Sequence, residues 1–226
     1  HQVKVRFMHK QTYGFKAFNA GDEITFVRWD SLATYAPNRV KDAKLIDEKE
    51  MLLSLEKALP ADINEKDVIE NVTWTPEVEI RGCQVSRIPT RGFLISTRRK
   101  VLVENNTFHK TRMSGILLAQ DAKSWFESGC IRDVTIRENV FIKCAEPVIS
   151  VNPSNIAAND SVHKNIRVLG NTFILRGHRM LRAKSTKGLT VKDNKVYSEK
   201  RLKAESAIQT DDCADVKISD NLYLVF

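Results

Sequence analysis

Two carboxylates, Asp121 and Glu127, lie six residues apart in the segment GILLAQDAKSWFESG, with the aromatic residues Trp125 and Phe126 between them. A pair of carboxylates cleaves a glycosidic bond when the groups lie about 5 Å apart for retention of configuration or roughly 6.5 to 9.5 Å apart for inversion. An aromatic ring beside such a pair offers an apolar face on which a sugar stacks. The pattern therefore suggests glycoside hydrolysis, with Asp121 and Glu127 as candidate catalytic residues. The alternative is a surface carboxylate that caps a loop turn, beside two rings that cover an apolar strand.

An eight-residue phrase recurs six times in the second two thirds of the chain and supplies strands to position these groups. Its copies begin at Val78, Val101, Val134, Ile166, Leu189 and Val216, and their sixth letters are Cys83, Asn106, Asn139, Asn171, Asn194 and Asn221. The first and third letters are aliphatic in every copy, so these side chains face one side of a strand. Successive sixth letters are separated by 23, 33, 32, 23 and 27 residues.

Coils of about 23 residues, with a repeated apolar column and an Asn at one bend, are typical of a right-handed parallel β-helix, here of about six coils. Stacking spaces equivalent residues of neighbouring coils about 4.8 Å apart, so each Asn amide can hydrogen-bond the next one. We expect these Asn residues to adopt the left-handed backbone conformation of the bend. A leucine-rich repeat is the rival fold, but its L-x-x-L-x-L register is missing from the repeats.

A second strand lies between the phrases, and its copies align on Leu94, Leu117, Ile149, Leu181 and Ile208. This alignment directs Phe93, Ile95, Ile116, Leu118 and Val148 outward, which predicts an apolar outer face that other groups cover. Two intervals exceed 23 residues by about ten, and the excess falls in the loops Gln120–Ile131 and Asn152–Asn165. Inserted loops on one edge of a repeat structure commonly build its binding face.

Residues 1–75 do not carry the phrase. The segments VKVRFMH and DEITFVR alternate as strands do, and NAGDE between them has turn chemistry. Residues 47–59 fit either a short helix or a pair of strands. We therefore predict an all-β protein, with a small β-barrel-like insertion module at residues 1–75 followed by the parallel β-helix at residues 76–226.

Composition narrows the possible partners. The net charge of +8 comes from Lys and Arg scattered over the whole chain, which indicates general surface solvation and no nucleic-acid-binding face. No apolar stretch reaches the roughly 18 residues that a membrane span needs. The chain starts at His1 within an alternating pattern and shows no signal peptide, so we interpret it as a fragment or a processed piece. The four cysteines, Cys83, Cys130, Cys144 and Cys213, lack metal or redox spacing, and we expect buried free thiols and no metal or cofactor.

The repeat alignment tests whether Asp121 has an acidic partner on a neighbouring coil. The residues aligned with it are Arg98, Pro153, Ser185 and Asp212. Asp212 is the one acid among them, and it lies three coils, or about 14 Å, from Asp121. The alignment therefore predicts no complete acid pair on adjacent coils.

Basic and polar residues near the inserted loops are candidates for substrate binding. We expect Arg98 and Arg112, with the more distant His109, to cluster on neighbouring coils and to bind hydroxyl or carboxylate groups. A solvated basic edge is the alternative. Together with Trp125 and Asn152, the two arginines make up the predicted substrate-binding set.

Three longer segments resemble the C-terminal half of glycoside hydrolase family 110. They are WTPEVEIRGC from Trp74, PTRGFLISTRRKVLVENNTF from Pro89 and MSGILLAQDAKSWFESG from Met113. The segments QTYGFKAF and GDEITFV resemble the barrel insertion of the same family. The resemblance implies a bacterial, secreted or periplasmic exo-α-galactosidase that releases terminal α-1,3-linked galactose from glycans such as blood group B structures. It also implies an inverting, metal-independent reaction with two carboxylates.

The same resemblance bears on the two acids. The leading acids of that family, including an adjacent Asp pair, fall on coils before the barrel insertion, which implies that the central acids lie upstream of His1. Asp121 and Glu127 would then serve in supporting or binding roles as much as in catalysis. Two other functions fit the fold: a non-catalytic carbohydrate-binding or adhesin module, and a polysaccharide lyase that uses Lys or Arg as base with a calcium ion. The lyase requires clustered acids on adjacent coils, which the repeat alignment does not show.

Overall fold

A computed structural model describes residues 1–7, 14–127 and 129–226. The segment QTYGFKAF therefore falls partly outside the described residues. The chain divides into two compact units, and the boundary is not a single point in the sequence. The first unit comprises His1–Thr75 together with Asp121–Ser128 and Ser154–Ala157, and the second comprises the remaining residues from Pro76 to Phe226.

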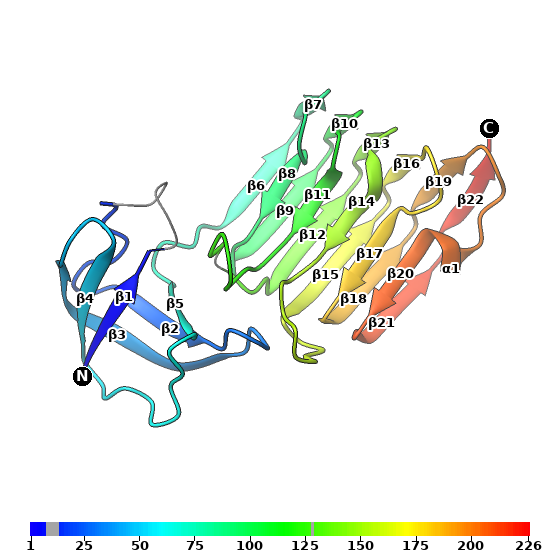
Figure 1. The fold of residues 1–226 in the computed structure, drawn as a ribbon. Helices are drawn as coiled ribbons and strands as arrows, with labels where there is room; N and C mark the ends of the chain where they lie inside the picture. Colours follow the sequence, from blue (N-terminus) through cyan, green and yellow to red (C-terminus); the bar gives the residue numbers. More distant parts are fainter. Residues whose placement is uncertain (8–13, 128) are drawn as a thin grey trace. The chain divides into compact units, whose positions relative to one another are not determined.

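The first unit is built around a five-stranded antiparallel sheet in the order β1-β4-β3-β2-β5 (Figure 1). Its strands are β1 (Gln2–Arg6), β2 (Glu23–Val27), β3 (Thr34–Leu45), β4 (Glu50–Leu55) and β5 (Val68–Asn71). Alternate residues of β4, Met51, Leu53 and Leu55, are buried in its core. A period of two is the pattern of a strand, so the helix that we considered for residues 47–59 is wrong. The pair of strands is also wrong, because the segment forms the single strand β4, which pairs with β1 and β3.

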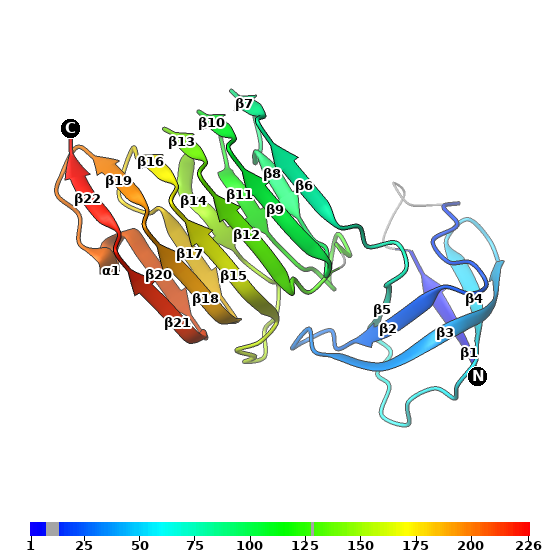
Figure 2. The same ribbon diagram turned by 180° about the vertical axis from the view of Figure 1, so that it is seen from behind.

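The second unit is the six-coil parallel β-helix that the repeats predict, with three parallel sheets along its length (Figures 1 and 2). The β6 sheet contains β6 (Val78–Arg81), β9 (Lys100–Glu104), β12 (Asp133–Arg137), β15 (His163–Leu169), β18 (Thr186–Lys192) and β21 (Ala214–Ser219). The β7 sheet contains β7 (Gln84–Ser86), β10 (Thr107–His109), β13 (Val140–Ile142), β16 (Thr172–Ile174), β19 (Lys195–Ser198) and β22 (Leu222–Val225). The β8 sheet contains β8 (Phe93–Ile95), β11 (Ser114–Leu118), β14 (Ala145–Val151), β17 (Leu181–Lys184) and β20 (Ile208–Asp211), and the one-turn helix α1 (Ala204–Ala207) precedes β20.

The Asn residues form a hydrogen-bonded ladder between the β6 and β7 sheets, as the sequence predicts. The backbone N of Asn106 donates to Oδ1 of Asn139 at 2.9 Å, and its Nδ2 donates to the same atom at 3.0 Å. Asn139 repeats both bonds to Asn171 at 3.0 Å. The left-handed conformation falls on the residue before each Asn, for example Asn105 (φ 55°) and Glu138 (φ 56°). Our expectation that the ladder Asn adopts it is therefore wrong, because the Asn side chain must turn inward to bond its neighbours.

Aromatic rings stack inside the β-helix behind the ladder. Phe108 lies 4.7 Å from Phe141, and Phe141 lies 4.9 Å from Phe173, with interplanar angles of 13° and 9°. A Cβ at Gly115 would come within 3.0 Å of the Phe141 ring, so glycine lets β11 pass the stack without displacing a ring. One ring on each of these three coils thus fills the core at the coil spacing, and Val85 and Val196 take the same position on the coils to either side.

The register of the β8 sheet differs from the sequence alignment by one residue in its first two copies. Ile116 pairs with Phe93 on one side and with Ile149 on the other, so Ile116 and Phe93 belong to the inner column in place of Leu117 and Leu94. A bulge between Ser114 and Ile116 shifts the pairing of β11 with β14, so that Ser114 lies opposite Ala145 and Ile116 lies opposite Ile149. A slip of one residue exchanges the two faces of a strand. Phe93, Ile95, Ile116 and Leu118 therefore pack into the core. Val148 lies in the third copy, whose register is as predicted, and is buried together with Ile149, so the outward apolar face that we expected is wrong.

The cysteines are free thiols, as expected, but they are not all buried. Cys130 and Cys144 are buried and Cys213 is half-buried, whereas Cys83 is exposed. Cys83 takes the ladder position on the first described coil, where one neighbouring coil covers it and the other side is open to solvent. Among the described residues, no helix is long and apolar enough to cross a membrane.

His163 is fully buried at the start of β15 and is held there as a neutral imidazole. Its Nδ1 accepts a hydrogen bond from the backbone N of Ile131 at 3.1 Å, so the ring proton sits on Nε2. Burial disfavours the charged ring, and the nearby cation of Arg132 adds to this effect, which lowers the pKa of His163 to about 3.

Replacing the central ladder residue should destabilise the β-helix. In Asn139→Ala, the backbone and side-chain donors of Asn106 lose their shared acceptor, and we expect a loss of roughly 2 to 4 kcal/mol in unfolding free energy. Asn221→Ala is the matched variant at the last coil: it removes the same shared acceptor from Asn194, but Asn221 is half-buried, so water can replace the acceptor and the loss should be smaller. Urea unfolding of both variants checks this order, and equal losses would contradict the ladder as a cooperative element.

The neutral His163 should make the fold sensitive to acid. The imidazole has its ordinary pKa of 6.5 in the unfolded chain and a pKa of about 3 in the folded one, so the unfolded state binds the extra proton between these values. This contribution to stability is complete above pH 6.5 and falls by about 1.4 kcal/mol per pH unit below it. In His163→Asn, which keeps an acceptor for Ile131, this slope should vanish, whereas His178→Asn at an exposed position should leave it unchanged. An unaltered slope in His163→Asn would refute the buried neutral ring.

Candidate functional site

Asp121 organises the inserted loop that follows strand β11. Its Oδ1 accepts from the backbone N of Lys123 at 2.8 Å, and its Oδ2 accepts from the backbone N of Trp125 at 2.6 Å and from Oγ of Ser124 at 2.7 Å. Asp residues favour this role because a short carboxylate reaches the backbone a few residues ahead. The carboxylate therefore shapes the turn that presents the aromatic pair.

The same contacts keep Asp121 ionised. Partial burial opposes the charged form, but hydrogen bonds from Ser124 and from the backbone of Trp125 and Lys123 outweigh it and lower the pKa of Asp121. A general acid in glycoside hydrolysis needs a raised pKa so that it holds a proton near neutral pH. The environment of Asp121 is therefore suited to a carboxylate that accepts hydrogen bonds.

The aromatic pair is presented at the surface of the first unit. The side chain of Trp125 is 55% exposed and that of Phe126 is 41% exposed. Phe126 adopts a left-handed backbone conformation, with φ of 50°, which is costly for an aromatic residue. The loop thus keeps two large apolar rings in contact with water, which is typical of a binding surface.

Glu127 closes the same loop through its backbone. Its carbonyl oxygen accepts from the backbone N of Asp121 at 3.0 Å, and the residue itself is half-buried. The loop then returns to the β-helix at Gly129, where a Cβ would lie 2.5 Å from the carbonyl oxygen of Ser96. Asp121 and Glu127 are thus the two ends of one closed loop.

The second inserted loop joins the first one in the same compact unit. Oγ of Ser154 donates to Oδ1 of Asp121 at 3.1 Å, which links the two loops directly. The backbone N atoms of Ile156 and Ala157 donate to the carbonyl oxygen of Asp30 at 2.8 and 3.1 Å. Three segments that are distant in sequence therefore meet at Asp121 and at the β2–β3 connection.

The β2–β3 connection also contacts the first loop through Trp29. Nζ of Lys123 lies 5.6 Å from the centre of the Trp29 ring, and Nζ of Lys66 lies 4.7 Å from it. Cations near the face of an indole ring are attracted to its negative quadrupole. Trp29 thereby adds a side-chain contact to the backbone hydrogen bonds at Asp30.

Asp67 holds this connection in place from within the barrel. It accepts from the hydroxyl of Tyr35 at 2.6 Å, from Nη1 of Arg28 at 2.9 Å and from the backbone N of Trp29 at 3.2 Å. Burial opposes its charge, but these bonds and one from the backbone of Asn64 prevail, and the pKa of Asp67 is lowered. Burial and the bond to Asp67 raise the pKa of Tyr35, so its proton is retained.

The predicted binding residues Arg98, Arg112 and Asn152 lie in the second unit and do not form one cluster. Arg98 and Asn152 occupy turns that lead from the β8 sheet to the β6 sheet. Arg112 lies at the opposite end of the β8 sheet strands, separated from Arg98 by the length of β11, about 16 Å. His109 is the last residue of β10, in the β7 sheet. The expected cluster of Arg98, Arg112 and His109 is therefore wrong, because positions on neighbouring coils fall on different edges of the helix.

The corrected register also changes the residues aligned with Asp121. Leu118 pairs with Val151, so the position three residues later aligns Asp121 with Ser154 and not with Pro153. By the same count, the residues aligned with Asp121 on the next two coils are Thr186 and Cys213, and not Ser185 and Asp212 as the sequence alignment had them. Sequence reasoning missed Ser154, Trp29 and Asp30. The correct strand register would have identified Ser154 as the partner of Asp121, whereas no pattern in the sequence links the β2–β3 connection to the two loops.

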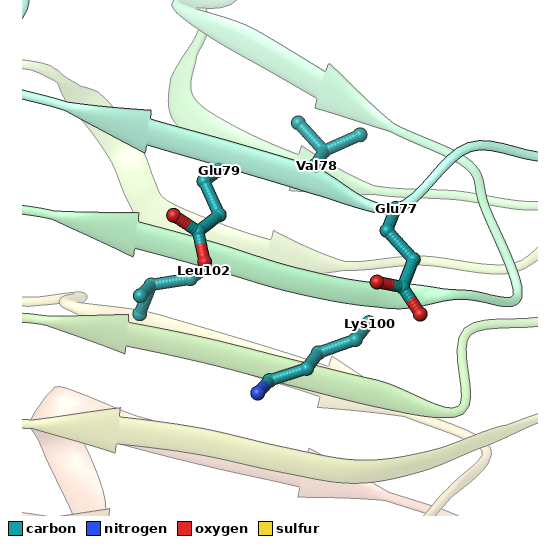
Figure 3. A pocket seen from close by; sticks show the side chains of 5 residues that line it. All are labelled: Glu77, Val78, Glu79, Lys100 and Leu102. Carbon is teal, nitrogen blue, oxygen red and sulfur yellow. The ribbon is translucent and has the colours of Figure 1, made fainter.

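A shallow hollow of about 190 Å³ lies at the beginning of β6 and β9 (Figure 3). Glu77 and Glu79 point to the same side, as residues two apart on a strand do, and Lys100 and Leu102 complete the lining with Val78. Glu79 is exposed and forms an ion pair with Arg81 at 3.3 Å. The hollow is an open, charged surface and holds none of the predicted site residues. Among the residues that the structure describes, no group of three or more His, Cys, Asp or Glu side chains is placed to hold a metal ion.

Comparison with protein families matches both units of the chain. Residues 2–69 match the family described as GLAA-B beta-barrel domain II. Residues 68–223 match the family described as right handed beta helix region. The barrel-like module and the handedness predicted for the β-helix are thereby supported by independent matches.

Curated relatives match nearly the whole chain. A protein named alpha-1,3-galactosidase A from Bacteroides thetaiotaomicron is 46% identical over 97% of this chain and 40% of its own length. One of the same name from Akkermansia muciniphila is 44% identical over 92% of this chain and 35% of its own length. An alpha-1,3-galactosidase B from B. thetaiotaomicron is 33% identical over 97% of this chain and 38% of its own length.

These matches confirm the resemblance noted in the sequence. The chain spans about 40% or less of the length of these relatives, so it corresponds to a portion of each. With more than half of its residues matched by the β-helix family and with α-1,3-galactosidases as its curated relatives, the chain belongs to the right-handed β-helix family.

Proposed function

We propose that the protein containing this chain is a glycoside hydrolase that releases terminal α-1,3-linked galactose from glycans. The observation that carries the proposal is the similarity to proteins named alpha-1,3-galactosidase, which extends through the barrel, both inserted loops and the β-helix. Glycans with blood group B type ends are the proposed substrates. Because such glycans lie outside the cell, the proposal includes secretion or export to the periplasm.

The loop centred on Asp121 is proposed to form one wall of the galactoside site. Trp125 offers an exposed ring on which the apolar face of galactose stacks. Asp121 is proposed to hold the backbone that presents this ring, because its carboxylate accepts hydrogen bonds from three successive residues. Arg98, Arg112 and Asn152 are further candidates for contacts with hydroxyl groups, and the two edges on which they lie make separate contacts with a branched glycan.

The proposed reaction is inverting. One carboxylic acid protonates the glycosidic oxygen while a second carboxylate removes a proton from the attacking water. The lowered pKa of Asp121 suits the ionised partner in this pair, or a ligand of the sugar hydroxyls, and does not suit the proton donor. Glu127, half-buried at the other end of the loop, is the candidate for the donor within this chain.

A carbohydrate-binding module without catalysis is the second candidate function. It is favoured by one observation: the Asp121 carboxylate is occupied by hydrogen bonds from its own loop and from Ser154. A carboxylate used in this way orders a binding surface and need not take part in proton transfer. This reading predicts affinity for galactosides without turnover.

Galactose release by the full-length protein tests the proposal. The protein should release galactose from Galα1-3Gal and much less from an α-1,4-linked isomer, and proton NMR of the first turnovers should show β-galactose, the inverted anomer. The 226-residue chain, assayed separately, should bind the disaccharide and show little turnover if the central acids lie elsewhere. Failure of the full-length protein to cleave the α-1,3 linkage would reject the hydrolase and leave the binding module.

Two substitutions in the loop separate stacking from proton transfer. Trp125→Ala should raise KM about tenfold or more with a smaller change in kcat, because the ring contributes binding energy. Trp74→Ala is the matched control, since Trp74 is 54% exposed in the same unit. Asp121→Asn should weaken binding by the same factor at every pH from 5 to 8. The lowered pKa keeps the wild-type carboxylate ionised over this range, so the variant removes the same charge throughout. A loss of kcat that follows the titration of a carboxyl group would instead place Asp121 in the proton transfer.

A further inference from the structure

The turns that lead from the β7 sheet to the β8 sheet carry an unusual concentration of positive charge. These five turns are residues 87–92, 110–113, 143–144, 175–180 and 199–207. They contain ten Lys or Arg residues against two acids, Glu199 and Glu205. The ten are Arg87, Arg91, Lys110, Arg112, Lys143, Arg176, Arg179, Lys200, Arg201 and Lys203, which we call the basic ridge.

The other two edges of the β-helix do not share this charge. The turns from the β6 sheet to the β7 sheet contain no Lys or Arg and three acids, Glu138, Asp193 and Asp220. The turns from the β8 sheet to the β6 sheet carry four basic and four acidic residues. Our expectation of a diffuse charge is therefore wrong, because turns that are scattered in sequence converge on one edge once the chain is coiled.

The ridge cations face solvent and are not neutralised by nearby acids. Eight of the ten side chains belong to exposed residues, Arg91 and Arg179 being half-buried. Within the described part of the chain, none of the eight forms an ion pair, although Arg182 pairs with Asp211 and Arg137 with Glu104 on the sheet faces. The ridge is therefore an open field of positive charge.

Three of these cations occupy aligned positions on successive coils. Arg87, Lys110 and Lys143 occupy the same position on successive coils, one residue after β7, β10 and β13. All three adopt the left-handed conformation, with φ of 55°, 54° and 51°, and the backbone N of each of Arg87 and Lys110 donates to the next coil at 2.9 Å. Like charges on neighbouring strands repel at a spacing of about 4.8 Å, so this column lowers stability unless an anion binds it.

The fourth turn is fixed by a carboxylate that accepts three of its backbone N–H groups. The carboxylate of Glu146 accepts from the backbone N atoms of Gly177, His178 and Arg179 at 2.7, 2.8 and 2.7 Å. A Cβ at Gly177 would come within 2.9 Å of this carboxylate, so glycine permits the approach. The one acid beside this turn is thus used by the backbone, and Arg176 and His178 remain exposed.

We propose that the basic ridge binds an anionic polysaccharide, a chain whose sugars carry sulfate or carboxylate groups. Five rows of cations at the coil spacing extend over about 19 Å, which matches a linear chain with an anionic group on successive sugars. The ridge turns contain no Phe, Tyr or Trp, the residues on which nucleic-acid bases stack. The choice of a glycan over other polyanions rests on the proposed function, since a glycan-trimming enzyme meets such chains beside its substrate. Binding there would raise the local concentration of cleavable ends.

Charge-matched variants of the full-length protein test the ridge. Arg87→Gln, Lys110→Gln and Lys143→Gln together remove the stacked column, whereas Lys16→Gln, Lys41→Gln and Lys44→Gln remove the same charge from exposed positions in the barrel unit. The probes are fluorescent dextran sulfate and chondroitin sulfate, with uncharged dextran, a DNA duplex and anionic phospholipid vesicles beside them. Circular dichroism confirms that each variant is folded.

The wild type and the barrel variant should bind both sulfated chains with affinity that falls steeply with salt, and neither should bind uncharged dextran. The ridge variant should bind about tenfold or more weakly, with a shallower salt dependence, while release of galactose from Galα1-3Gal stays unchanged. Equal losses in both variants, or tighter binding of DNA or vesicles than of the sulfated chains, would overturn the proposal. The binding assay with fluorescent chains does not depend on catalysis. If the protein binds these chains but releases no galactose, the proposed function is rejected and the ridge remains an anion-binding edge.

Discussion

The coil-to-coil register is the constraint on which the rest of this structure depends. Each coil must place its backbone about 4.8 Å above the last one, and the Asn ladder satisfies buried donors at the bend between the β6 and β7 sheets only when consecutive Asn residues are in register. The stacked Phe rings obey the same spacing. Once this register is set, every insertion must leave and re-enter the helix at a turn, which determines where loops and charges gather.

The inserted loops show how that constraint produces a surface with chemistry. The Asp121 carboxylate closes the loop after β11 on itself. Ser154, which takes the position aligned with Asp121 on the next coil, links this loop to the second one. The backbone of the β2–β3 connection then accepts the second loop at Asp30. Asp121 therefore has a structural role that is sufficient to explain its contacts, and any catalytic role is additional to it. The loop leaves the rings of Trp125 and Phe126 exposed beside this carboxylate.

Much of the fold is predictable from the sequence because its determinants are local and repeated. Five Asn residues in a fixed place within an alternating phrase indicate the ladder, the inner columns and the number of coils. The second strand is less predictable, because a bulge at Ser114 shifts the register and Leu117 is as apolar as Ile116. The partners of Asp121 and the basic ridge depend on which turns share an edge. Lys110 and Lys143 are 33 residues apart in sequence and become neighbours only in the coiled chain.

Hydrogen exchange at the ladder tests the account most directly. The backbone N–H groups of Asn106, Asn139, Asn171 and Asn194 are each donated to a side-chain oxygen of the next coil, at a bend that would otherwise be open to water. Their exchange, followed by NMR, should be as slow as that of the core strands and should require global unfolding. Exchange of these amides as fast as that of Lys123 and Ser124 in the inserted loop would contradict a β-helix held in register by its Asn ladder.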